Sequence, residues 1–202
     1  MKRPKLLLAT TNPGKIKEIK KYLTSLPIEI LALKEINFRE NYLEKGSTFL
    51  ENARGKAIFY SKHFGGLTLA EDSGLEIEKL KGAPGVYSAR FAGEEGDDEK
   101  NIQKVLSLMR GVPQEERKAR FVSTLILARQ GKIIKEIVET VEGYILEEKK
   151  GNYGFGYDPI FYYSPLAKTF AQLLPEEKNK VSHRGKGLKR LREFLEEYFK
   201  TK

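Results

Sequence analysis

Several short stretches of the sequence place polar residues at spacings that suit chemistry on an anionic ligand. The first reads Thr10-Thr11-Asn12-Pro13-Gly14-Lys15 and lies between an apolar run and a helical pattern. A strand that turns into a helix directs free backbone N–H groups and the positive end of the helix dipole at one point, so this turn suits an anion. It lacks the spacing of a Walker A loop. A plain turn with Asn12 as the helix cap is the structural alternative.

The second stretch runs from Glu44 to Lys56 and reads E-K-G-S-T-F-L-E-N-A-R-G-K. On a helix that begins near Ser47, Asn52 and Lys56 are four residues apart and share one face. Glu44 precedes the helix, close to its N-terminus. The stretch therefore offers a carboxylate and an ammonium group to a charged ligand. A helix capped by Ser47, with its charges in solvent, is the alternative.

Glu71 and Asp72 belong to a third stretch, A-E-D-S-G, which follows a short apolar run. Only four of the 28 acidic residues are aspartates. Because the chain otherwise uses Glu, we expect each Asp to have a specific role at its position. Two carboxylates at the end of a buried strand are costly unless a positive group lies beside them. The pair is therefore a candidate metal ligand or general base, with a plain polar turn as the alternative.

Two further stretches lie in the second half of the chain. Residues 151–159 alternate glycines with aromatic residues and include Asp158. Aromatic rings can stack on a flat ligand ring, and the carboxylate can accept hydrogen bonds from ring N–H groups. Residues 178–185 gather cationic and hydroxyl donors before a helical pattern, which again suits an anion. A structural glycine-aromatic loop and a capping or core role for His183 are the alternatives.

Hydrophobic periodicity predicts the elements that must hold these residues. The expected strands cover 5–10, 28–33, 67–70, 119–129 and 132–146, and the expected helices cover 14–25, 48–64, 98–109 and 186–199. The opening β-turn-α-β unit is typical of α/β domains. The two long strands are expected to form a hairpin at Gln130-Gly131. The strand that ends at Ala70 is expected to deliver Glu71 and Asp72 into a turn, and residues 79–97 are expected to be a loop.

Composition limits the chemistry further. The 202 residues suffice for a single domain over 1–202, expected to have two lobes around a central substrate cleft. Cysteine is absent and histidine occurs twice, which excludes disulfides, thiolate nucleophiles and Cys- or His-rich metal sites. A metal would be held by carboxylates, which points to a hard ion such as Mg²⁺. Heavy use of Lys and Glu is typical of a thermophile's surface.

The net charge of +9 is unevenly distributed along the chain, with the positive excess at its two ends. Such a pattern suits a polyanionic ligand that meets a carboxylate-held metal. No contiguous basic tract or interleaved aromatic-basic motif supports nucleic-acid binding. No apolar run approaches the roughly 18–20 residues of a membrane span. The apolar run after Lys5 is too short for a signal peptide, so we expect a cytoplasmic protein that binds neither membrane nor nucleic acid.

Six motifs, in this order, resemble those of the inosine triphosphatase family, the noncanonical purine NTP pyrophosphatases also called XTP/dITP diphosphatases. They read T-T-N-P-G-K, E-x-G-x-T-F-x-E-N-A-x-x-K-A, A-E-D-S-G-L, G-A-P-G-V-Y-S-A-R, F-G-Y-D-P-I-F and S-H-R-G. The resemblance extends from about Leu6 to the final helix. It implies Mg²⁺-dependent hydrolysis of ITP, dITP and XTP to the monophosphate and pyrophosphate. It also implies a homodimer of elongated α/β subunits, each with a mixed sheet and a cleft between two lobes.

The same resemblance assigns roles to individual residues. It implies that Asp72, Lys15 and Lys56 are catalytic and that Glu44 and Asp72 hold the metal. The implied substrate-binding residues are Thr10, Thr11, Asn12, Pro13, Gly14, Lys15 and Lys56 at the phosphates, Ser73 beside them, and Phe155, Gly156, Tyr157, Asp158, Lys178, His183 and Arg184 at the base.

Base selection has a chemical basis. Hypoxanthine and xanthine present an acceptor oxygen at C6 and a donor N1–H, whereas adenine presents an amine at C6 and has no N1 proton. Donors from Arg184, Lys178 or the backbone would pair with the C6 oxygen of hypoxanthine or xanthine. The same donors would face the amine of adenine and stay unpaired, which disfavours adenine strongly.

The sequence departs from the pattern of this family at two positions, and two other functions are alternatives. The chain has Glu71 where many relatives have a second Asp, and Tyr153 where Gly is common. One alternative is a Maf-like pyrophosphatase acting on pyrimidine nucleotides, against which the S-H-R-G and F-G-Y-D-P motifs count. The other is a nucleotide or nucleic-acid binding module without turnover.

Overall fold

The computed structural model describes residues 3–36, 38, 40–93 and 96–200. Its strands are β1 (Lys5–Leu8), β2 (Glu29–Ala32), β3 (Leu67–Ile77), β4 (Lys118–Arg129), β5 (Lys132–Ile145), β6 (Phe161–Tyr163) and β7 (Lys168–Thr169). Its α-helices are α1 (Pro13–Leu23), α2 (Phe49–His63), α3 (Asp98–Leu108), α4 (Pro175–Val181) and α5 (His183–Lys200). Throughout this described part, every helix is too short or too polar to span a bilayer.

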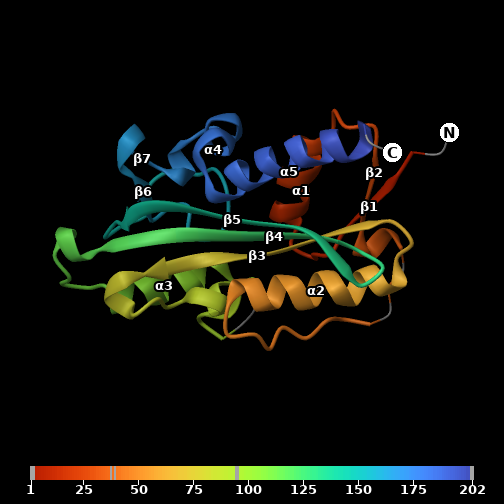
Figure 1. Ribbon diagram of the computed structural model, residues 1–202. Helices are drawn as coiled ribbons and strands as arrows, with labels where there is room; N and C mark the ends of the chain where they lie inside the picture. The colour runs from red at the N-terminus through yellow and green to blue at the C-terminus, as the bar shows by residue number, and fades with distance from the viewer. Residues whose placement is uncertain (1–2, 37, 39, 94–95, 201–202) are drawn as a thin grey trace. The chain divides into compact units, whose positions relative to one another are not determined.

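The strands form a mixed sheet in which β1 is parallel to both β2 and β3 (Figure 1). Over the described residues, the seven strands follow the order β2-β1-β3-β4-β5-β6-β7. The last two pairings, β5 with β6 and β6 with β7, are antiparallel. The predicted α/β class with a mixed sheet is confirmed. The predicted hairpin is also confirmed, because β4 and β5 are neighbours joined at Gln130-Gly131.

The chain divides into two compact units, and neither is continuous in sequence. Unit 1 comprises Met1–Asp72, Ser123–Val138 and Gly187–Lys202, and unit 2 comprises Ser73–Val122 and Glu139–Lys186. The boundary falls inside β3, β4, β5 and α5, and it separates the sequence neighbours Asp72 and Ser73. The single domain with a central cleft stays a prediction.

Unit 1 has apolar side chains on both faces of its strands, because successive strand residues point to opposite faces. On one face, Leu6, Leu8, Leu67 and Leu69 pack with α1 and α5. On the other face, Ala70 and its neighbours pack against α2. In Figure 1, α2 accordingly lies on one side of β3 and β4, with α1 and α5 on the other. A strand buried on both faces reads as a continuous apolar run, as the Leu6-to-Ala9 segment does.

Unit 2 has a core of its own, in which α3 packs against the apolar face of the strands. Its members include Leu75 and Ile77 from β3 and Phe161 and Phe170 from the later segments. At the edge of this core, the guanidinium of Arg117, which is 1% exposed, donates to four backbone carbonyls. These are Ile145 at 2.6 Å, Met109 at 2.7 Å, Leu146 at 2.8 Å and Val112 at 3.2 Å. Arg117 therefore joins the C-terminal end of α3 to the end of β5.

The prediction that a strand ends at Ala70 and delivers Asp72 into a turn is wrong. The strand β3 continues for 11 residues to Ile77 and includes Glu71, Asp72, Ser73 and Gly74. None of these four residue types favours a strand. However, β1 pairs only with the start of β3, as far as Leu69. The extension past Ala70 therefore follows β4, the other neighbour of β3, and pairing with this long strand outweighs the weak local preference.

Smaller differences occur at element boundaries. Thr48, not Ser47, caps α2, because its Oγ1 accepts from the Glu51 nitrogen at 3.1 Å. The expected loop over 79–97 contains a 3-10 helix at Gly85–Arg90. The final helix begins at His183 rather than Lys186, and the short helix α4 was not predicted.

Candidate functional site

The predicted anion-binding turn has the expected strand-turn-helix form. Asn12 is the N-cap of α1, and its Oδ1 accepts from the Lys15 nitrogen at 3.0 Å. The Asn12 nitrogen in turn donates to Thr10 Oγ1 at 3.2 Å. Pro13 is at the start of the helix, where its lack of an N–H costs no helical hydrogen bond. The capping alternative is thus confirmed, and it is compatible with anion binding because the cap fixes the direction of the first-turn N–H groups.

Asp72 lies on β3 and is 7% exposed. Its Oδ2 accepts from Asn52 Nδ2 on α2 at 3.0 Å. The other end of the same amide, Oδ1, accepts from the Gly46 nitrogen at 2.8 Å. Asn52 is 1% exposed, so this buried side chain fixes Asp72 relative to the segment that precedes α2.

The charges around Asp72 come from residues that the sequence had indicated. Burial raises the pKa of Asp72 above its ordinary value, the Lys15 ammonium opposes this, Glu44 raises the pKa further, and Lys56 lowers it. Lys56 Nζ forms an ion pair with Glu44 and also approaches the Glu71 carbonyl oxygen at 3.4 Å. Unit 1 therefore gathers Lys15, Glu44, Lys56 and Asp72 within electrostatic reach of one another.

Glu71 is oriented differently from Asp72. It is 1% exposed, and its Oε1 accepts from Ser123 Oγ on β4 at 3.1 Å. Successive strand residues point to opposite faces, so Asp72 faces α2 while Glu71 shares the face of Leu67 and Leu69. The two neighbouring carboxylates therefore do not form the side-by-side pair that the sequence suggested.

The carboxylates of unit 1 fit a magnesium ion of the kind that binds together with a phosphorylated substrate. Within the described residues, no three His, Cys, Asp or Glu side chains cluster as a metal site. Mg²⁺, however, usually keeps several waters and takes one or two carboxylates plus substrate phosphates. Glu44 and Asp72 are close enough for Glu44 to raise the pKa of Asp72, which is the mutual repulsion that a shared cation relieves.

Unit 2 gathers the predicted base-binding residues around a buried ion pair. Lys178 Nζ lies 2.5 Å from Asp158 Oδ2, and both side chains are almost fully buried. The same oxygen accepts from the Phe155 nitrogen at 3.0 Å. Gly154 has a φ of +80°, and a Cβ there would lie 2.0 Å from Asp158 Oδ2, so only glycine fits. The carboxylate thus holds both the ammonium group and the glycine-rich loop.

Two cations lie against the Phe155 ring. Lys178 Nζ is 4.8 Å and Arg184 Cζ is 5.2 Å from the ring centroid. Arg184 Nη2 also donates to Ser73 Oγ at 3.1 Å. His183 is 4% exposed, and its ring stacks on Phe121 with centroids 4.7 Å apart. Unit 2 therefore brings Ser73, Phe155, Lys178 and Arg184 together, as expected of residues that share one ligand.

Tyr157 is also in unit 2, but its side chain is buried at 4% exposure. Its hydroxyl donates to the Ser88 carbonyl oxygen at 2.8 Å. Sequence reasoning did not assign a role to Ser88, nor to Asn52 and Ser123. The Asn52–Lys56 spacing was the one available signal, because the other partners are distant in sequence.

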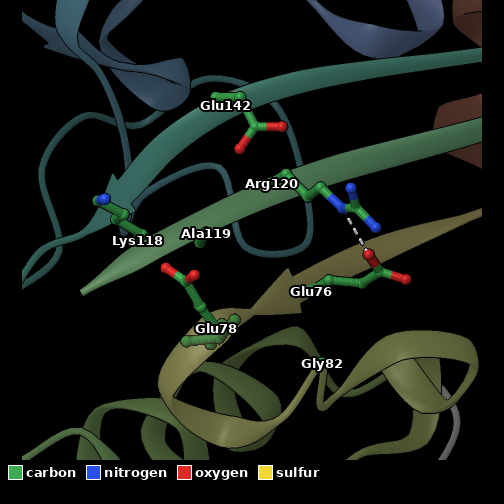
Figure 2. A pocket seen from close by; sticks show the side chains of 8 residues that line it. Glu76, Glu78, Gly82, Lys118, Ala119, Arg120 and Glu142 are labelled. Atoms are coloured by element: carbon green, nitrogen blue, oxygen red, sulfur yellow. Dashed lines mark hydrogen bonds and ion pairs between the residues drawn. The ribbon is translucent and has the colours of Figure 1, made fainter. Parts of the chain in front are cut away.

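A separate pocket of about 320 Å³ opens in unit 2 between β3, β4 and β5 (Figure 2). Its lining residues are Glu76, Ile77, Glu78, Gly82, Lys118, Ala119, Arg120 and Glu142. Arg120 Nε and Glu76 Oε2 are 2.7 Å apart across it. None of the described residues predicted for the site lines this pocket, and Arg120, one of its two cationic side chains, is already paired with Glu76, so we do not assign the chemistry to it.

The chain is similar to known proteins over nearly its whole length. A model of the Ham1 family matches residues 6–194. A dITP/XTP pyrophosphatase of Bacillus subtilis (strain 168) is 49% identical over 190 residues, which cover 94% of this chain and 96% of the relative. Another, from Desulforamulus reducens, is 48% identical and covers 95% of each chain.

Solved structures extend the similarity to the fold. A HAM1 protein from Coxiella burnetii matches with a TM-score of 0.86 at 39% identity, over 96% of this chain and 99% of that one. The Staphylococcus aureus Ham1 protein matches with a TM-score of 0.85, also at 39% identity and with the same coverage. Sequence and fold are similar over nearly the full length of this chain and of the proteins that it matches, so this chain belongs to the Ham1 family.

Proposed function

We propose that this chain hydrolyses dITP, ITP and XTP to the monophosphate and pyrophosphate, and so removes deaminated purines from the nucleotide pool. The observation that carries the proposal is the buried Asp72 carboxylate, fixed by Asn52 and surrounded by Lys15, Lys56 and Glu44. The B. subtilis and D. reducens relatives are named dITP/XTP pyrophosphatases and match over nearly their whole length, which supports the same activity here.

The triphosphate is bound by the turn from Thr10 to Lys15, with Lys56 as a further contact. The turn supplies the backbone N–H groups of a capped helix N-terminus, and the two lysines supply positive charge. The Lys56 ammonium pairs with Glu44 in the free protein. A phosphate that binds Lys56 competes for this pair and leaves Glu44 available to a cation.

Glu44 and Asp72 hold Mg²⁺ together with the substrate phosphates. The bound ion supplies neutralisation of phosphate charge in the transition state. The alternative of a nucleotide or nucleic-acid binding module without turnover leaves two repelling carboxylates, one of them buried, without a catalytic function.

Cleavage of the α–β phosphoanhydride requires an in-line water and no protein nucleophile. The water oxygen bonds to the α-phosphorus while the bond from that phosphorus to the bridging oxygen breaks, and the electron pair leaves with pyrophosphate. Asp72 accepts the proton from the water. Because burial raises the pKa of Asp72, this carboxylate is a stronger base than an exposed aspartate.

The residues of unit 2 contact the nucleobase. Phe155 offers a ring face, and Lys178 and Arg184 offer donors to the C6 oxygen of hypoxanthine or xanthine. Asp158 already accepts from Lys178 and from the Phe155 nitrogen, so its main effect is to hold these two groups. His183 and Gly156 complete the set that the resemblance assigns.

The proposal includes a homodimer in the cytoplasm. The homodimer is supported by the resemblance to the inosine triphosphatase family, and sedimentation of the purified chain tests it. The cytoplasmic location is supported by the substrates, since deaminated triphosphates arise in the pool that feeds nucleic-acid synthesis.

A release assay tests the activity. The full chain is incubated with dITP, XTP, ITP, dATP, dGTP and dUTP in Mg²⁺, and pyrophosphate and orthophosphate are measured separately. We expect pyrophosphate from the first three nucleotides, and none after EDTA. Orthophosphate release would refute the proposed bond cleavage, equal rates with dATP and dITP would refute the base selectivity, and a preference for dUTP would favour the Maf-like alternative.

A further inference from the structure

The motif Gly82 to Arg90, G-A-P-G-V-Y-S-A-R, contributes no residue to the proposed contacts, yet it is one of the six motifs on which the resemblance depends. It forms a 3-10 helix over Gly85–Arg90 in unit 2. Ser88 is the buried residue of that helix, at 8% exposure, whereas the preceding Tyr87 is 59% exposed. A buried serine in a turn whose other residues are half-buried or exposed points to a specific hydrogen-bonding role.

The side chain of Ser88 attaches the motif to β3. Its Oγ accepts from the Leu75 nitrogen at 2.9 Å and donates to the Gly85 carbonyl oxygen at 2.6 Å. The approach is close, because a Cβ on Gly74 would lie 2.2 Å from Ser88 Oγ. Gly74 directly follows Ser73, whose hydroxyl accepts from Arg184. Ser88 therefore fixes the backbone next to Ser73, a proposed substrate contact that also accepts from the base-site residue Arg184.

The main chain of Ser88 attaches the motif to the glycine-aromatic loop. Its carbonyl oxygen accepts from the Tyr157 hydroxyl at 2.8 Å. Tyr157 immediately precedes Asp158, which holds the Lys178 ammonium and the Phe155 nitrogen. Burial raises the pKa of Tyr157, so its hydroxyl stays protonated and remains a donor at any pH of interest.

We propose that Ser88, acting through Gly74 and Tyr157, is a positioning residue that sets the selectivity for the nucleobase. This inference rests on the proposed base contacts of Phe155, Lys178 and Arg184. Those contacts come from separate segments of unit 2, and Ser88 joins the strand next to Ser73 to the loop before Asp158. Recognition by directed donors tolerates displacements of only about 0.5 Å. Weakening the hydrogen bonds of Ser88 should therefore lower the selectivity between nucleobases more than it lowers kcat.

Single-atom variants test this inference. Tyr157→Phe removes only the hydroxyl, and Ser88→Ala removes only the Oγ. For each variant, kcat and KM are measured for dITP and dATP in Mg²⁺. We expect the ratio of kcat/KM for dITP over dATP to fall roughly three- to tenfold, the effect of one hydrogen bond. In Ser88→Ala the loss should appear in the KM for dITP, with kcat within about twofold of the parent.

Matched controls separate positioning from loss of folding. Tyr87→Phe removes an exposed hydroxyl from the same motif and should leave the ratio unchanged. Ser88→Thr keeps the hydroxyl and should retain most of the selectivity. A lower melting temperature with an unchanged ratio in both Ser88→Ala and Tyr157→Phe would refute the inference, as would an equal loss of kcat on both nucleotides. If the parent chain itself released no pyrophosphate from dITP, the proposed function would fail instead.

Discussion

Asn52 Nδ2 donates to Asp72 Oδ2 across 3.0 Å, from helix α2 to strand β3. The same amide accepts from the Gly46 nitrogen, two residues after Glu44. Asn52 is thus a buried link between the proposed proton acceptor and the segment that carries the second metal carboxylate. Its two hydrogen bonds connect Asp72 to the backbone just after Glu44, while the Glu44 carboxylate itself pairs with Lys56.

Asn52→Leu removes both bonds while nearly keeping the side-chain volume. We expect kcat for dITP to fall about ten- to a hundredfold, as is usual when a group that orients a metal carboxylate is lost. The Mg²⁺ concentration for half-maximal rate should also rise. Initial rates of pyrophosphate release over a Mg²⁺ series measure both effects. Ser61→Ala, which removes another buried hydrogen-bonding group from α2, is the control and should keep kcat. A parent-like kcat in Asn52→Leu would refute the role.

The pH dependence of activity follows from Asp72. Burial and Glu44 raise the pKa of Asp72 above its ordinary value of 3.8, and this outweighs the lysines. A proton acceptor works only when deprotonated, so kcat/KM should fall as the pH drops through that raised value. Bound Mg²⁺ would lower this pKa, so the acid limb is measured with dITP at Mg²⁺ well below the concentration for half-maximal rate, where it should lie above pH 3.8. An acid limb at or below pH 3.8 would contradict the assignment.

The raised pKa of Asp72 also affects the stability of the fold. A carboxylate paired with a cation usually has a lowered pKa and stabilises the fold when ionised, whereas the ionised form of Asp72 destabilises it. Between pH 3.8 and the raised pKa, the folded state binds more protons than the unfolded state, so stability falls as the pH rises through this window. At neutral pH in EDTA, Asp72→Asn should therefore melt above the parent chain while losing most of kcat. The difference should vanish below pH 3.8. Thermal unfolding followed by circular dichroism at the two pH values measures it.

Asp97 offers a control, because its replacement is expected to change the melting temperature in the opposite direction. Its hydrogen bond from the Lys100 backbone nitrogen lowers the pKa of Asp97, so its ionised form stabilises the fold above pH 3.8. Asp97→Asn should melt below the parent chain at neutral pH. A rise in melting temperature for both variants would mean that a general loss of negative charge, not the burial of Asp72, causes the effect.

Lys178 and Asp158 form a buried pair, and removing one partner leaves the other charge buried. We expect Asp158→Asn and Lys178→Met each to lower the free energy of unfolding by about 3–5 kcal/mol. The double variant should be more stable than the sum of the two losses predicts. Urea unfolding of the three variants measures this coupling. Additive losses would show that the two charges do not stabilise each other.

Arg117 is expected to be a purely structural residue. Arg117→Met leaves four backbone carbonyl oxygens without their donor, two of them in fully buried hydrogen bonds, and should cost about 3 kcal/mol or more of unfolding free energy. The exposed Arg110→Met should change stability by less than about 0.5 kcal/mol. Urea midpoints compare the two. The soluble, folded fraction of Arg117→Met should keep the parent's preference for dITP over dATP.

Much of the fold was predictable because it depends on local pattern. The run from Leu6 to Ala9, the cap at Asn12 and the Gln130-Gly131 hairpin each follow from a few adjacent residues. The extension of β3 through Asp72 does not, because its residues favour a turn and β1 pairs only as far as Leu69, so the neighbouring strand β4 must hold them extended. That extension decides which way Glu71 and Asp72 point, so the predicted turn was wrong for a nonlocal reason.

The residues of the candidate site also divide into those that the local sequence identifies and those that only nonlocal contacts reveal. Lys15, Lys56 and Asp72 were identified by residue type and motif, and the structure places them within electrostatic reach of one another. The residues that hold them were missed or left without a role. Asn52 and Asp72 are 20 positions apart, Ser123 and Glu71 are 52 apart, and Tyr157 and Ser88 are 69 apart. No window of sequence contains both members of such a pair.

The interleaving of the two units affects how the chain is made. The core of unit 1 needs Leu188, Leu191 and Leu195 from α5 to cover Leu6 and Leu8. During synthesis, domains usually fold as they emerge, beginning with the N-terminal one. Here β1 waits for α5, so the nascent chain carries exposed apolar strands until α5 has been synthesised. Its dependence on chaperones should therefore exceed that of a chain of equal length whose units follow one another in sequence.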